Sequence, residues 1–182
     1  MKELKLIGKR ITLRPLKSSD VKDIYLNIQN KKIAENILDM PWPYSIRDAQ
    51  KFIKKMQKAR QKKSDFAFGI ESKTRKEVIG CIGLYKINFK HKNGELGYWL
   101  GPKYWNQGIM TEAGKLVLDF AFSKLKLHRV WGGAFSNNLA SQKVLKNLGF
   151  KKEGVFRQAF WHFDCWRDGI HYGLLSKEFL KK

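Results

Sequence analysis

The chain has 182 residues, 43% hydrophobic and 13% aromatic, and this composition excludes an intrinsically disordered protein, which combines low hydrophobicity with high charge. Its length fits one domain over residues 1–182, and its formal net charge of +21 favours anionic ligands. Because no segment is long and apolar enough to span a membrane, and no apolar signal stretch follows Met1, we expect a cytoplasmic protein.

The first third of the chain predicts one strand and two helices. Residues 10–16 alternate apolar and polar side chains, as in a strand, and residues 18–28 predict a helix opened by a serine cap. Residues 41–44, Pro-Trp-Pro-Tyr, interrupt the pattern. Ser45 then opens a second helix, with Asp48 placed to complete a capping box.

The rest of the chain alternates between strand and helix patterns. Three consecutive strands, over residues 66–71, 78–89 and 95–101, predict antiparallel pairing. After a glycine-containing loop come a helix, a strand over 129–135, a helix over 138–148 and two strands over 153–163 and 170–176, with a turn at 167–169. The strand–helix–strand unit requires a parallel crossover. The fold is therefore a mixed α+β fold, with helices on both faces of a mixed sheet.

The loop at residues 105–111, Trp-Asn-Gln-Gly-Ile-Met-Thr, joins a strand directly to a helix start. The first N–H groups of a helix lack intrahelical acceptors and carry partial positive charge, so they bind phosphate. Gly108 would let the backbone approach such a ligand closely. Since the loop has neither a Walker lysine nor dinucleotide-binding glycine spacing, it predicts by itself only an anion site.

The sequence around this loop resembles the GNAT acetyltransferase superfamily, and more narrowly its RimJ/RimL-type branch of ribosomal-protein N-terminal acetyltransferases. The similarity lies in Gly97-Tyr98-Trp99-Leu100, Tyr104-Trp105, Gln107-Gly108, Met110-Thr111-Glu112-Ala113, Asn138-Leu139-Ala140-Ser141 and Val144 to Phe150, and extends to Leu13-Arg14-Pro15-Leu16 and 168–174. It implies a three-layer fold with a mostly antiparallel sheet of six to seven strands and about four helices. It also implies an acetyl-CoA-dependent N-acetyltransferase without a metal.

The resemblance assigns the cofactor contacts to the loop and the following helix start. They are Gln107, Gly108, Ile109, Met110, Thr111 and Glu112. Two positions depart from the usual superfamily loop, because Trp105 stands first and Met110 replaces a small residue. Met110 changes only how the loop packs, since the phosphate ligands are main-chain N–H groups.

The resemblance also implies roles in the transfer itself. The N–H of Leu100 would polarise the thioester carbonyl, and Asn138 would contact the pantetheine arm. Many members use a tyrosine as the acid, but Leu145 stands at that position here. Ser141, which would meet the sulfur, is therefore the candidate acid. Glu95 would be the base. Alternative interpretations are a helix cap for Asn138, an inert surface hydroxyl for Ser141 and a solvated turn residue for Glu95.

The acceptor is implied to be a primary amine, most plausibly the N-terminal α-amine of a ribosomal or other protein. A small-molecule acceptor, such as a polyamine, antibiotic or amino acid, is the alternative. A basic ribosome- or RNA-binding protein that keeps the fold without catalysis is an alternative of another class. The acceptor side is expected near residues 41–44 and Phe160-Trp161, with His162 or His171 as further candidates, and a monomer or a homodimer fits equally.

The basic charge and the cysteines complete the expectations. Lysines outnumber arginines 29 to 8 and are spread along the chain, so compositional bias is favoured over direct nucleic-acid binding. Neither Cys81 nor Cys165 lies near a second Cys or His at a spacing typical of metal ligands, so both are predicted to be structural residues.

Overall fold

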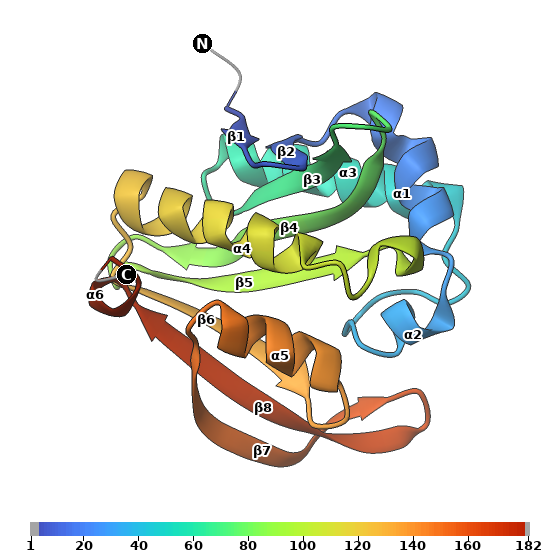
Figure 1. Cartoon of the computed structure of the whole chain (residues 1–182). Helices are drawn as coiled ribbons and strands as arrows, with labels where there is room; N and C mark the ends of the chain where they lie inside the picture. The colour runs from blue at the N-terminus through green and yellow to red at the C-terminus, as the bar shows by residue number, and fades with distance from the viewer. Residues whose placement is uncertain (1–3, 181–182) are drawn as a thin grey trace.

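The computed structural model describes residues 4–180, and its centre is one mixed sheet of eight strands in the order β1-β2-β3-β4-β5-β6-β8-β7 (Figure 1). The pairing of β5 with β6 is parallel, and the other pairings are antiparallel. The strands are β1 (Leu6–Ile7), β2 (Ile11–Pro15), β3 (Phe66–Ser72), β4 (Val78–Asn88), β5 (Asn93–Leu100), β6 (Arg129–Phe135), β7 (Lys151–His162) and β8 (Cys165–Leu175).

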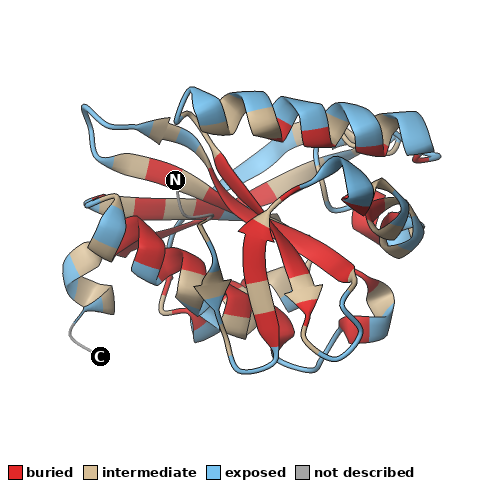
Figure 2. Cartoon of the chain, turned by 90° about the horizontal axis from the view of Figure 1, so that it is seen from above, coloured by how far each residue is buried: buried red, intermediate tan, exposed pale blue. Residues whose placement is uncertain are grey.

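Helices cover both faces of the sheet, so the fold has three layers (Figure 1). The helices are α1 (Val21–Ile28), α2 (Lys31–Ala34), α3 (Ile46–Gln61), α4 (Ile109–Asp119), α5 (Leu139–Asn147) and α6 (Ser176–Phe179), with short 3₁₀ turns at 18–20 and 102–104 and a π turn at 120–124. The larger core lies under α4 and α5, and the smaller core lies under α1 and α3. Figure 2 shows the buried positions concentrated on the strands and on the inner sides of the helices.

Strand β5 contributes to both cores because its side chains alternate between the two faces. Leu96, Tyr98 and Leu100 face the core under α4 and α5, whereas Trp99 belongs to the core under α1 and α3. Gly97 lies against the ring of Tyr85, where an added Cβ would come within 3.0 Å. The alternation therefore aims Tyr98 at the helices that follow the glycine loop.

The expected order of the main elements and the mixed sheet are confirmed, but several details differ. Within residues 4–180 the structure has six helices rather than about four, because the short helices α2 and α6 of four residues each are additional. The sheet has eight strands rather than six to seven, because Leu6–Ile7 pairs with β2 as an additional strand. Two residues are too short to show an alternating pattern. The helix expected from residue 18 starts with a 3₁₀ turn, and the carboxylate of Asp20, not a serine hydroxyl, caps it by accepting from the Lys17 N–H at 2.7 Å.

The hairpin turn expected at residues 167–169 is wrong. The strands β7 and β8 meet at Phe163 and Asp164, whose φ angles of 49° and 56° form a tight turn of the kind that matches strand twist. Asp168 lies inside β8, and its carboxylate accepts from the Gln158 N–H at 2.7 Å, where β7 shifts register. An Asp-Gly pair usually marks such a turn, but here the aspartate instead supports a bulge.

Candidate functional site

Strands β5 and β6 pair at one end and then separate. Their parallel register runs from Asn93 opposite Arg129 to Glu95 opposite Trp131, and no pairing follows, although β5 continues to Leu100 and β6 continues beyond Trp131. Figure 1 shows the two strands diverging from their shared end, with α4 beside β5 and α5 beside β6. The divergence leaves main-chain groups of β5 without a neighbouring strand.

The N–H of Leu100 is one of these main-chain groups. The N–H of Gly101 donates to Ile79 O of β4 at 2.9 Å. Because successive N–H groups of a strand point to opposite sides, the Leu100 N–H points away from β4, toward the divergence. No acceptor for it is found within residues 4–180. The Leu100 carbonyl accepts from Trp105 Nε1 at 2.6 Å, which fixes the start of the glycine loop.

Tyr98 and Ser141 connect β5 to α5 near the divergence. The Tyr98 hydroxyl lies 2.8 Å from Ser141 Oγ and donates to the Ser141 carbonyl at 3.2 Å. Burial raises the pKa of Tyr98 to about 12, although the hydrogen bond with Ser141 acts in the opposite direction. The phenol therefore stays neutral at physiological pH and can donate. Tyr98 belongs to the segment that carries the family resemblance, but no local pattern indicated a role for it, because a tyrosine on an alternating strand looks like an ordinary core residue.

Asn138 and Leu145 have structural roles in α5. The Asn138 side chain caps the helix by accepting from the Ser141 N–H at 3.1 Å, and so holds the residue that carries the candidate acid. Leu145 is buried in the core. Gly149, with φ of 94°, ends the helix as expected.

The loop before α4 has the backbone geometry of an anion site. Gly108 adopts a left-handed conformation, φ 73° and ψ 4°, at the N-cap position of α4, and Asn106 also has a positive φ of 59°. Within residues 4–180, the N–H groups of residues 108–111 have no acceptor. The N–H of Glu112 donates to Gly108 O at 3.1 Å, so that group is already used. Four adjacent donors at a helix start fit a phosphate group.

Arg10, the residue just before β2, braces this loop. Its guanidinium donates to Gln107 O at 2.7 Å and to the Glu112 carboxylate at 2.9 Å, and its own N–H donates to the same carboxylate at 2.9 Å. Another guanidinium nitrogen would lie 3.7 Å from a Cβ added at Gly108. Arg10 thus brings positive charge to the helix start. No local pattern could predict this contact, because Arg10 and Glu112 lie 102 positions apart in the chain.

The Glu112 carboxylate holds the loop through Arg10. Partial burial would raise its pKa, but the hydrogen bonds from the Arg10 N–H and guanidinium outweigh that effect and lower the pKa. With both its N–H and its carboxylate engaged, Glu112 stabilises the loop. The free donors for a bound phosphate lie on the preceding residues.

Glu95 stands at the point where the strands separate. It is the last β5 residue paired with β6, and it lies opposite Trp131. Its carboxylate forms an ion pair with Lys86 at 2.8 Å, and the Lys86 ammonium also lies 5.5 Å from the Trp131 ring centroid. The side chain is 26% exposed, so water can reach it.

Aromatic side chains gather on β6, β7 and β8 next to Glu95. The His171 ring stacks on the Trp131 ring with their centroids 6.2 Å apart, and it meets the Phe156 ring edge-on with a centroid distance of 4.2 Å. Burial lowers the pKa of His171. Farther along, His162 Nε2 lies 2.9 Å from Ala34 O, which ties β7 to α2.

The two segments expected to form the acceptor side have different neighbours. Tyr44 is buried in the core under α1 and α3. The Phe160 ring packs against the Phe135 ring. The rings of Trp161 and Trp166 contact each other on an exposed surface, with their centroids 5.4 Å apart.

Other candidate chemistry is limited within residues 4–180. No group of three or more His, Cys, Asp or Glu residues there could hold a metal ion, and no helix there is long and apolar enough to cross a membrane. Cys81 and Cys165 are free thiols. Burial raises the pKa of the Cys81 thiol, so it stays protonated.

Comparison with known proteins identifies the chemistry that this geometry serves. Residues 10–151 match the model of the acetyltransferase (GNAT) domain. The chain belongs to the GNAT acetyltransferase family. It is therefore an acetyl-CoA-dependent N-acetyltransferase, as the resemblance implied.

Individual relatives of this acetyltransferase support the assignment. It is 34% identical over 177 residues to the "Probable N-acetyltransferase YjcK" of Bacillus subtilis, covering 95% of this chain and 98% of that protein. A ribosomal-protein-S5-alanine acetyltransferase from Vibrio fischeri has the same fold, with a TM-score of 0.86, 24% identity and coverage of 97% and 99%. So does a spermidine N-acetyltransferase from Vibrio cholerae, solved with CoA and spermine, with a TM-score of 0.81, 23% identity and coverage of 94% and 98%. The fold thus serves both protein and polyamine acceptors.

Proposed function

We propose that this acetyltransferase transfers the acetyl group to the N-terminal α-amine of a protein while both substrates are bound. The observation that supports a peptide acceptor is the sheet surface beside the strand divergence. There Trp131, His171 and Phe156 pack together, and the neighbouring carboxylate of Glu95 is already paired with Lys86. Aromatic rings suit the end of a peptide, whereas the ammonium groups of a polyamine need unpaired carboxylates. A net charge of +21 also repels polyamines.

The glycine loop is the proposed phosphate site for acetyl-CoA. The N–H groups of residues 108–111 would bind the phosphate oxygens, and the Arg10 guanidinium would add positive charge beside Gly108. Asn138 would contact the pantetheine arm while its side chain caps α5. The cofactor supplies an activated thioester, and the residues of the chain position it.

Three groups on β5 and α5 would act on the transfer. The Leu100 N–H would donate to the thioester carbonyl oxygen, whose negative charge grows as the amine nitrogen attacks the carbonyl carbon. As the carbon–sulfur bond breaks, Ser141 would protonate the departing sulfur. Tyr98 is a positioning residue, since its neutral hydroxyl lies within hydrogen-bond distance of both Ser141 Oγ and the Ser141 carbonyl and so holds the Ser141 side chain in place.

Glu95 is the proposed base, acting through a water molecule on the ammonium of the acceptor. The ammonium nitrogen loses two protons in the reaction. One replaces the proton given by Ser141, and the other passes to solvent. Lys86 would keep the Glu95 carboxylate in place without covering it, because the side chain remains partly exposed.

A comparison of acceptors tests this proposal. The purified protein, with acetyl-CoA, is offered peptides with a free N-terminus, the same peptides with a blocked N-terminus and an internal lysine, and spermidine. Mass spectrometry locates each acetyl group. We expect acetylation of free N-termini, with kcat/KM for spermidine lower by about 100-fold, which corresponds to about 2.7 kcal/mol. Preference for spermidine, or equal acetylation of the blocked peptides, would overturn the peptide assignment.

A further inference from the structure

Helix α3 carries a dense concentration of positive charge. Residues 46–63 contain eight lysines or arginines and one acidic residue, Asp48, a net charge of +7. A tenth of the chain therefore holds a third of the total net charge of +21. The lysines of the whole chain are spread along the sequence, but the structure gathers those of this segment on a single helix, Ile46–Gln61, and at its C-terminal end.

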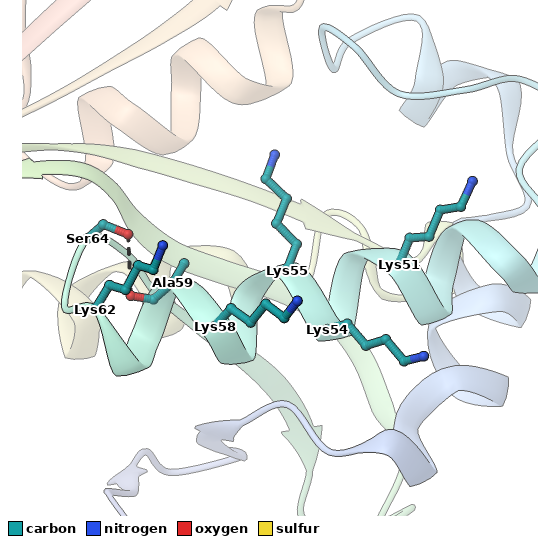
Figure 3. A pocket seen from close by; sticks show the side chains of 7 residues that line it. All are labelled: Lys51, Lys54, Lys55, Lys58, Ala59, Lys62 and Ser64. Carbon is teal, nitrogen blue, oxygen red and sulfur yellow. Dashed lines mark hydrogen bonds between the residues drawn. The ribbon is translucent and has the colours of Figure 1, made fainter.

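Five of these lysines lie along the outer side of α3. Lys51, Lys54, Lys55, Lys58 and Lys62 recur at intervals of three and four residues, so they share one side of the helix. They line an open hollow of about 500 Å³ together with Ala59 and Ser64. Figure 3 shows the five side chains extending outward along the helix, separate from one another. The opposite side of α3 packs on the sheet through its apolar stripe.

The carboxylates of residues 4–180 leave most of this lysine row uncompensated, and only Asp48, near Lys51, interacts with it electrostatically. Within residues 4–180, no carboxylate lies within ion-pairing distance of the five ammonium groups. The Asp48 carboxylate instead accepts from Ser45 at the helix cap, and that of Asp65 accepts from the Lys86 N–H and from Ser64. An ordinary solvated helix surface mixes acids with lysines at these spacings, because like charges four residues apart destabilise a helix. The row therefore suits a polyanion as its neighbour.

We propose that the lysine row of α3 binds the phosphate backbone of a nucleic-acid duplex. From Lys51 to Lys62 the row extends about 16 Å, the axial length of about five phosphates on one strand. Lysines act as point charges and contact phosphates without reading bases. The exposed positions of α3 carry no aromatic ring on which an unpaired base could stack, which favours a duplex over a single strand. Binding is therefore independent of sequence.

The lysine row and the acetyl-CoA loop lie on opposite faces of the sheet. Helix α3 covers the face with the smaller core, whereas the glycine loop leads into α4 over the larger core (Figure 1). A bound duplex would not compete with acetyl-CoA. Nucleic-acid binding and acetyl transfer can therefore be measured separately, and failure of one does not imply failure of the other.

Fluorescence anisotropy with labelled 20-base-pair RNA and DNA duplexes of unrelated sequences tests the proposal. We expect both duplexes to bind with affinities that fall steeply with salt. The substitutions Lys54→Glu, Lys58→Glu and Lys62→Glu together should weaken binding at least tenfold and reduce the log–log salt slope by about 2.7. Glutamate is as good a helix former as lysine, so α3 should stay folded.

A second triple variant of equal charge is the control. Lys90→Glu, Lys124→Glu and Lys177→Glu change exposed lysines on other elements, and each triple lowers the net charge from +21 to +15. We expect the control to lose less than threefold in affinity, and both variants to keep the parental acetyl-transfer rate. Equal losses would reduce the effect to net charge and overturn the assignment to α3. Binding of polyglutamate as tight as that of the duplexes would overturn a nucleic-acid partner.

Discussion

The hydroxyl of Tyr98 lies 2.8 Å from Ser141 Oγ, a contact that joins β5 to α5 near the point where β5 and β6 separate. Many members of the superfamily have a tyrosine at the position of Leu145, which is buried in the core here. This chain places a tyrosine hydroxyl beside the candidate acid from a strand instead of from the helix. Tyr98 and Ser141 are therefore expected to act as a pair.

Removing the Tyr98 hydroxyl should slow acetyl transfer. In Tyr98→Phe the ring still fills its buried place, but Ser141 loses one hydrogen bond. We expect kcat to fall about tenfold, the value of one hydrogen bond, with little change in KM for acetyl-CoA. Steady-state kinetics at several acetyl-CoA concentrations measures both constants.

The pairing itself is tested by a double variant. Ser141→Ala removes the candidate acid, so adding Tyr98→Phe to it should cause little further loss. Fully multiplicative losses would show that the two hydroxyls act independently. An unchanged rate in Ser141→Ala would remove this residue from the mechanism.

Much of the fold was predictable from the sequence because periodic patterns are local. The helix opened by Ser45 and the helix ended by Gly149 are found as expected, since a capping box and a C-terminal glycine are local signals. The β7–β8 turn was not predictable. Phe163 and Asp164 adopt positive φ without glycine, which no local pattern indicates.

The candidate site was predictable only where residues lie close together in sequence. The glycine loop and the cap of α5 each fall within a few residues, and the structure gives both the expected local form. Arg10 with Glu112, and Tyr98 with Ser141, meet only after folding. A single sequence carries no signal for such distant pairs.

Acid should remove the stabilising effect of the Glu112 carboxylate. Its pKa is lower in the folded chain than the usual value of about 4.3, so its contribution is complete above that value and disappears as the pH falls through the folded pKa. Glu112→Gln should therefore lower the melting temperature at pH 7, and the difference from the parent should shrink below about pH 4. A difference that stays constant from pH 3 to pH 7 would contradict this role.

The buried ion pair between Arg14 of β2 and Asp20 should contribute to the stability of the fold and not to acetyl transfer. Arg14 donates to both carboxylate oxygens of Asp20 at 2.9 Å, and Asp20 is 3% exposed. Asp20→Asn leaves a buried guanidinium with reduced compensation, which should lower the free energy of unfolding by about 3 kcal/mol. The exposed pair of Lys31 with Glu35 is the control, and Glu35→Gln should cost about 0.5 kcal/mol or less. Urea unfolding measures the free energy of unfolding of both variants. Equal losses would contradict a stabilising role for the buried Arg14–Asp20 pair.

Acetyl-CoA binding to Gly108 variants tests the cofactor site most directly. Gly108→Glu puts a side chain and a negative charge at a left-handed position where the phosphates are expected, whereas Gly154→Glu adds the same charge on β7 where an added Cβ meets nothing within 4 Å. Calorimetric titration should show parental affinity in Gly154→Glu and a loss of at least about 100-fold in Gly108→Glu. Normal acetyl-CoA binding by Gly108→Glu would contradict the placement of the cofactor on this loop.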